Sequence, residues 1–84
     1  MKIKELIKSQ IRHINDMFID ITAPGNNNPE QRTASYLSGK TTAYRVMDLI
    51  KAAQLDGIIT EAERDQYETD TRSAFNRLLT VKEI

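Results

Sequence analysis

Residues 21–45 read ITAPGNNNPEQRTASYLSGKTTAYR and decide how the chain folds. The Pro-Gly pair stops a helix, and the three asparagines after it favour turns, because their short amides bond to the nearby backbone. Residues 28–31 (NPEQ) then predict a new helix. The asparagine can cap it, the proline suits its first position, and the glutamine can reach back to the cap. The stretch therefore predicts two helices joined by a tight connection.

Apolar side chains give the extent of these two helices. Isoleucine and phenylalanine recur every three or four residues from Ile3 to Ile21, which predicts a helix over residues 2–21. The second helix is predicted over residues 29–55. Its second half is apolar over a wide arc from Ala43 to Ala53, so we expect it to lie between the other helices or in an oligomer seam.

A third helix follows the helix-ending pair Asp56-Gly57. Residues 60–63 (TEAE) form a capping box, which predicts a helix over residues 61–79. Its predicted inner face consists of Ala62, Tyr67, Thr71, Ala74, Phe75 and Leu78. The fold class is therefore all-α: a small three-helix module, a helical hairpin plus a third helix, that forms a single domain over residues 1–84. We also predict that it is a homo-oligomer, because one neighbouring helix would not cover the apolar arc.

Composition excludes several classes of protein. Twelve basic and twelve acidic residues cancel, and the third helix opens on acids that would repel phosphate, so we predict no DNA partner. The absence of cysteine excludes disulfides and thiolate zinc sites. No apolar run approaches the roughly 18 residues that span a membrane, which predicts a cytoplasmic protein without a membrane partner. Basic residues outnumber acids in residues 1–12 and 29–51, so this part of the surface either meets an anion or is a solvated mixed-charge face.

Three motifs resemble chemical sites but lack essential parts. Residues 34–41 (ASYLSGKT) match a loose phosphate-loop pattern, yet a helix start rather than a strand precedes them. Residues 56–63 resemble half of an EF-hand, but Ala52 and Gln54 stand where acidic calcium ligands belong. His13 is the only histidine, so no catalytic or multi-histidine constellation can form. We therefore predict no enzyme activity, no metal and no cofactor.

The second helix carries a possible ligand surface. Arg32, Tyr36, Lys40 and Tyr44 recur every four residues and so form a slowly drifting stripe along one side of the helix. Cations suit phosphate, phenols offer stacking surface, and the neighbouring Gly39 allows close approach of a ligand or another backbone. The alternative is that both tyrosines lie at the edge of the core with the cations alongside.

The chain also resembles a known family. Residues 22–25 (TAPG), residues 30–32 (EQR) and the pair Lys40 and Arg45 are similar to the helical-hairpin domain of phage anti-CBASS and anti-Thoeris cyclic-nucleotide sponges, over about residues 11–50. The resemblance implies a non-enzymatic oligomer that sequesters cyclic di- or trinucleotide immune signals in the cytoplasm of a bacterial host. It implies phosphate contacts from Arg32, Lys40 and Arg45, base stacking by Tyr36 or Tyr44, and a turn at Pro24 and Gly25 that closes on the ligand.

A second class of function fits the same residues. A small helical inhibitor or adaptor, such as a phage anti-defence protein, would cover a host protein with the polar face of its second helix. Calorimetry with cyclic nucleotides separates the two hypotheses, because only the sponge would bind them.

Overall fold

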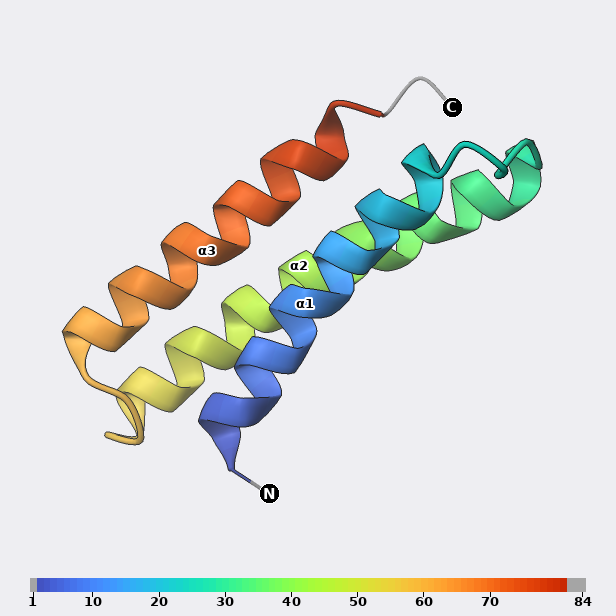
Figure 1. Ribbon diagram of the computed structural model, residues 1–84. Coiled ribbons are helices and arrows are strands. Elements are labelled where there is room, and N and C mark those ends of the chain that lie inside the picture. Colours follow the sequence, from blue (N-terminus) through green and yellow to red (C-terminus); the bar gives the residue numbers. More distant parts are fainter. Residues whose placement is uncertain (1, 82–84) are drawn as a thin grey trace.

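The computed structural model describes residues 2–81, which form three helices: α1 (Ile3–Thr22), α2 (Pro29–Leu55) and α3 (Glu61–Leu79) (Figure 1). No strand occurs within the described residues. The all-α prediction is confirmed, and the observed helix bounds lie within one residue of the predicted ones. The ends of the predicted domain, residue 1 and residues 82–84, lie outside the described part of the chain.

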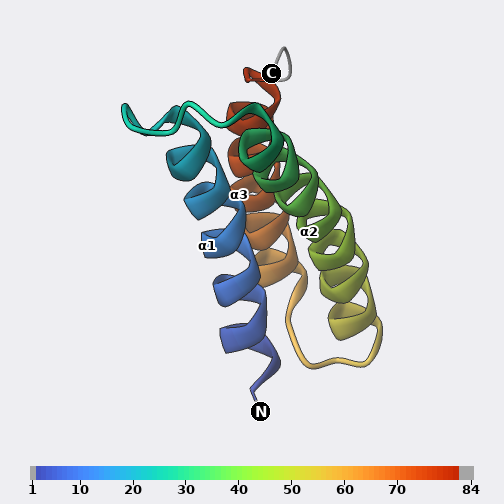
Figure 2. The same cartoon turned by 90° about the vertical axis from the view of Figure 1, so that its right-hand side faces the viewer.

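The helices run up, down and up in a three-helix bundle. Figure 1 shows α2 returning antiparallel to α1, and α3 reversing direction again. Each helix packs against both others, so they enclose one common core. Figure 2 shows that α2 keeps one long side turned away from both α1 and α3.

The connection between α1 and α2 is held by its asparagines. The Asn26 side-chain amide donates to the carbonyl of Asp20 (2.9 Å), and its backbone amide donates to Ala23 (3.0 Å). The Asn28 side chain caps α2 by accepting from the backbone amides of Glu30 and Gln31, as predicted. Among the described residues the Gln31 side chain makes no hydrogen bond to the backbone amide of Asn28, so the reciprocal half of a capping box is missing.

The connection between α2 and α3 turns on a glycine. Gly57 has φ +74°, a backbone conformation that side chains other than glycine rarely adopt. The amide of Ile58 donates back to the carbonyl of Ala53 (2.9 Å), and the side chain of Ile59 enters the core. Thr60 and Glu63 then form both hydrogen bonds of the predicted capping box, at 3.1 and 3.0 Å. This corner fixes where α3 begins against α2.

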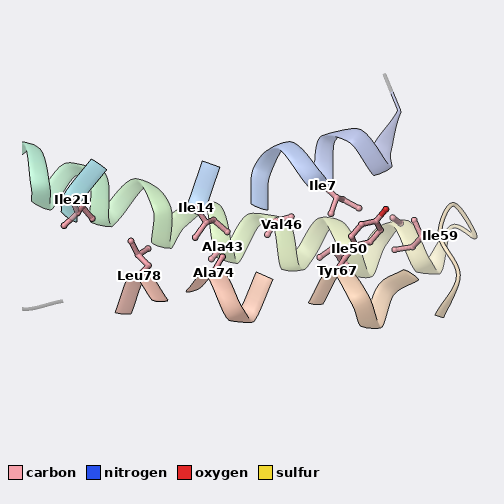
Figure 3. Packing of buried hydrophobic residues seen from close by; sticks show 11 residues of the cluster. Ile7, Ile14, Ile21, Ala43, Val46, Ile50, Ile59, Tyr67, Ala74 and Leu78 are labelled. Atoms are coloured by element: carbon pink, nitrogen blue, oxygen red, sulfur yellow. The ribbon is translucent and has the colours of Figure 1, made fainter. Parts of the chain in front are cut away.

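The buried residues of α2 and α3 are spaced mostly by three and four, and those of α1 by seven, the spacings of helices that pack nearly parallel. Figure 3 shows Ile14, Ala43 and Ala74 from the three helices meeting at mid-height. The fully or nearly fully buried apolar residues are Ile7, Ile14, Ile21, Ala43, Val46, Ile50, Ala53, Ile59, Tyr67, Ala74 and Leu78. The apolar half of α2 therefore lies between α1 and α3, which was one of its two predicted positions.

Small residues form the inner face of the first half of α2. Ser35, Gly39 and Thr42 are buried there. A Cβ atom on Gly39 would lie 2.8 Å from Leu78 Cδ2 and 3.2 Å from Met17 Cβ, so this glycine is where α1 and α3 both come close to α2. Burial of Ser35 is compensated, because its hydroxyl donates to Asp20 Oδ2 at 2.6 Å.

One predicted inner residue of α3 lies elsewhere. Ala62 is exposed, whereas the other predicted residues of that face are buried or half-buried. The first turn of α3 does not need an apolar side chain there, because Ile59, in the preceding connection, closes this end of the core.

Candidate functional site

The structure distributes the predicted ligand residues over three places. Arg32, Tyr36, Lys40 and Tyr44 follow one side of α2, as their four-residue spacing predicts. Gly25 lies in the α1–α2 connection, beside a hollow of about 460 Å³ formed with Asp20, Ala23, Asn26, Asn27, Asn28 and Gln31. Arg45 is exposed and lies five residues beyond Lys40, roughly 140° around the helix. One copy of the chain therefore does not bring all six residues to a single pocket.

The N-terminal half of the stripe is half-buried. Tyr36 packs against the core, and Lys40 Nζ lies 6.0 Å from the centroid of the Tyr36 ring, the outer limit of a cation–π contact. Arg32 is half-buried, and its Nε is shielded from solvent without a hydrogen-bond partner among the described residues. Tyr36 thus matches the edge-of-core alternative, while Arg32 Nε is a buried donor without a hydrogen-bond partner among the described residues.

The C-terminal half of the stripe borders an apolar groove between α2 and α3. The rings of Tyr44 and Phe75 meet edge to face, with centroids 5.7 Å apart. Beside them lies a groove of about 280 Å³, lined by Ala43, Tyr44, Met47, Thr71, Arg72 and Phe75. Of these, only Tyr44 had been predicted as a site residue. The others were missed because Phe75 and Met47 follow the core spacing, and that spacing alone does not show which core residues stay half-exposed.

The basic surface predicted for the first part of the chain is partly neutralised within the bundle. Lys4 Nζ lies 2.7 Å from Glu63 Oε2, so the basic start of α1 meets the acidic start of α3. Lys8 lines a groove between these helices together with Glu63 and Asp70. The charge asymmetry along the sequence therefore serves, in part, the packing of α1 on α3.

Through this ion pair, the stability of the fold at acid pH depends in part on the ionisation of Glu63. The hydrogen bond from Lys4, with that from the Thr60 amide, lowers the pKa of Glu63 below its ordinary value of 4.5. A lowered folded pKa gives stability that is complete above the unfolded pKa and is lost as the pH falls through the folded one. We expect Glu63→Gln, which can still cap α3, to lower the melting temperature slightly at neutral pH and to lose that effect below the folded pKa. Circular dichroism melts of both proteins across acid pH test this, and an equal difference at all pH values would contradict it.

The three incomplete motifs have structural positions in the bundle. Residues 34–41 lie in the middle of α2, so they form a helix and not a phosphate loop. His13 Nε2 and the Ser38 hydroxyl share a 3.0 Å hydrogen bond across α1 and α2. Glu63 binds Lys4 and caps α3, and no cluster of three potential metal ligands occurs in residues 2–81.

Comparisons of the chain with protein-family models, with curated proteins and with solved structures found no match. Across residues 2–81, no helix combines the length and apolar character needed to cross a membrane.

Proposed function

We propose that this chain is a non-enzymatic binding module that docks an amphipathic, acidic helix of another protein in the α2–α3 groove. The groove carries the proposal, because Tyr44, Met47 and Phe75 offer an elongated apolar surface between two helices. An amphipathic helix uses such a surface by inserting side chains from successive turns. Tyr44 is exposed and backed by Phe75, so it suits a contact that buries an aromatic ring.

Cations around the groove indicate the charge of that helix. Arg72 lines the groove, and its guanidinium is 3.7 Å from Glu68, a loose pair that leaves it largely exposed. Lys40 precedes Tyr44 by one turn, and Lys51 follows Met47 by one turn, so both flank the same side of α2. A helix with carboxylates beside its apolar face would complement these three charges.

Two designed peptides test this proposal by fluorescence anisotropy. Both carry leucine and phenylalanine on one helical face, and one has glutamates beside that face where the other has lysines. We expect only the acidic peptide to bind, and Lys51→Gln/Arg72→Gln to weaken it by about tenfold, since exposed charge pairs contribute modestly. Lys8→Gln/Arg12→Gln makes the same change in net charge on α1 and should leave binding intact. Equal binding of both peptides, or of neither, would refute the acidic-helix proposal.

The sponge hypothesis is retained as a second candidate because of Arg32. Its shielded Nε has no partner in the described chain, and Lys40 lies two turns further along the same side. These cations would hold phosphates of a cyclic di- or trinucleotide, with Tyr44 as the exposed ring for stacking. Because Arg45 lies on another side of α2, its implied phosphate contact would have to come from a second copy of the chain.

Calorimetry with a panel of cyclic di- and trinucleotides tests the second candidate. Charge-assisted hydrogen bonds contribute roughly 1.5–3 kcal/mol each, so Arg32→Ala/Lys40→Ala should weaken binding by about a hundredfold or more. Lys8→Ala/Arg12→Ala is the matched control. If the folded protein bound none of the nucleotides in the panel, this candidate would be eliminated and the helix-docking proposal would remain.

A further inference from the structure

The side of α2 that faces away from the bundle carries a second regular seam. Its members follow an unbroken spacing of four, three, four, three and four, and all are exposed: Leu37, Thr41, Tyr44, Asp48, Lys51 and Leu55. Three are large apolar side chains, with exposed fractions of 54% for Leu37, 58% for Tyr44 and 86% for Leu55. Figure 2 shows that one long side of α2 is not covered by α1 or α3. Such spacing is what a helix presents to another helix at a shallow angle.

This seam lies opposite the core seam of the same helix. Val46, which is 1% exposed, is nine residues from Leu37 and nine from Leu55. Nine residues make about two and a half turns, so these leucines lie on the side opposite Val46. A helix packed on the outer seam would therefore lie away from the core, and Tyr44, whose ring packs on Phe75, is the seam residue that borders α3.

We propose that the outer seam pairs with the same seam of a second copy, antiparallel, about a twofold axis that crosses α2 at the height of Val46 but on the opposite side of the helix. In this register each member meets a complementary residue of the other copy. Leu37 faces Leu55, Tyr44 faces Asp48, and Thr41 faces Lys51. The leucines bury each other at both ends, and each phenol can donate to a carboxylate. Because Tyr44 also lines the α2–α3 groove, a helix docked there would compete with the second copy for that side chain.

The proposed register also has the layers expected of an antiparallel coiled coil. In such a pair, a residue at heptad position a of one helix meets a residue at position d of the other. All three kinds of layer proposed here pair an a position with a d position. A parallel pair would place each residue against its own copy, so that Asp48 met Asp48 and Lys51 met Lys51. Charge thus favours the antiparallel arrangement. The two Arg45 side chains approach each other beside the axis, and Asp48 in the adjoining layer offsets that repulsion.

The contact is short, so we expect a dimer with a micromolar dissociation constant. Sedimentation from about 1 μM to about 1 mM brackets that range. Leu37→Gln/Leu55→Gln should weaken association by about a hundredfold or more, because four buried leucines are lost per dimer. Ile19→Gln/Ile58→Gln removes two other exposed apolar side chains, at 62% and 46%, and should leave association unchanged. A monomer throughout the range, or a dimer that survives the first variant, would overturn the proposal.

Cysteine cross-linking tests the direction of pairing, since the natural chain has no cysteine. Chains carrying Leu37→Cys and chains carrying Leu55→Cys are mixed, oxidised and separated by mass. We expect the mixed disulfide to dominate, because the antiparallel register brings these two positions within disulfide reach. Dominant disulfides between two Leu37→Cys chains would instead indicate parallel pairing and refute the register.

Discussion

Replacing Gly39 by leucine should cost the protein at least about 3 kcal/mol of folding free energy. Even the first added atom has no room, since a Cβ would lie 2.8 Å from Leu78 Cδ2 and 3.2 Å from Met17 Cβ. Met17 Cβ is fixed to the backbone of α1 and cannot turn aside, whereas the Leu78 methyl can move only within a core in which that residue is fully buried. Small domains have only about 5–15 kcal/mol of stability, so this variant should lose a large share of it.

The smaller substitution, Gly39→Ala, should destabilise the protein less than leucine does. Alanine gains roughly 1 kcal/mol of helix propensity over glycine, whereas overpacking costs about 1–3 kcal/mol. We therefore expect Gly39→Ala to destabilise by about 1 kcal/mol, measured by urea unfolding. Gly25→Ala is the control, because nothing lies within 4 Å of its Cβ position and its φ is not positive. It should change stability by less than about 0.5 kcal/mol. A stabilised Gly39→Ala variant would show that α1 and α3 do not pack on this glycine.

Gly39 also illustrates which features of the fold the sequence alone could not predict. Helix bounds were predictable, because caps and turns such as Asn28 and Thr60 act through residues near them in the chain. The polar, small-residue half of α2 suggested a ligand surface, but part of it instead permits close approach of other helices. Sequence shows that a residue is small, and only the position of the neighbouring helices shows what occupies the space beside it.

The candidate site was predictable to a similar extent. The four-residue spacing of Arg32, Tyr36, Lys40 and Tyr44 predicted a slowly drifting stripe, which follows from helical geometry alone because α2 is helical over all four residues. Neither the neutralising contact between Lys4 and Glu63 nor the groove beside Phe75 was predictable, because both depend on how α3 packs. Whether the stripe binds a ligand stays a prediction.

Replacing Ile50 by alanine should destabilise the fold by about 2–5 kcal/mol, the cost of a large core deletion. Ile50 is fully buried, and Figure 3 shows it between Ile7 of α1 and Tyr67 of α3, so its loss leaves a cavity that three helices surround. Leu55→Ala is the control: it removes a similar side chain that is 86% exposed, and should change the stability of the monomer by less than about 0.5 kcal/mol.

Urea unfolding at low protein concentration measures both variants on the monomer. Ile50 belongs to the seam inside the bundle, and Leu55 belongs to the seam outside it. The two variants therefore distinguish the contribution of α2 to folding from its contribution to self-association. We expect Ile50→Ala to lower the unfolding midpoint at every protein concentration. Leu55→Ala should have a visible effect only at high concentration, where the dimer would add stability by mass action. If Ile50→Ala cost less than about 1 kcal/mol, the arrangement of the core around α2 would be wrong, and with it the assignment of its opposite side to a second copy.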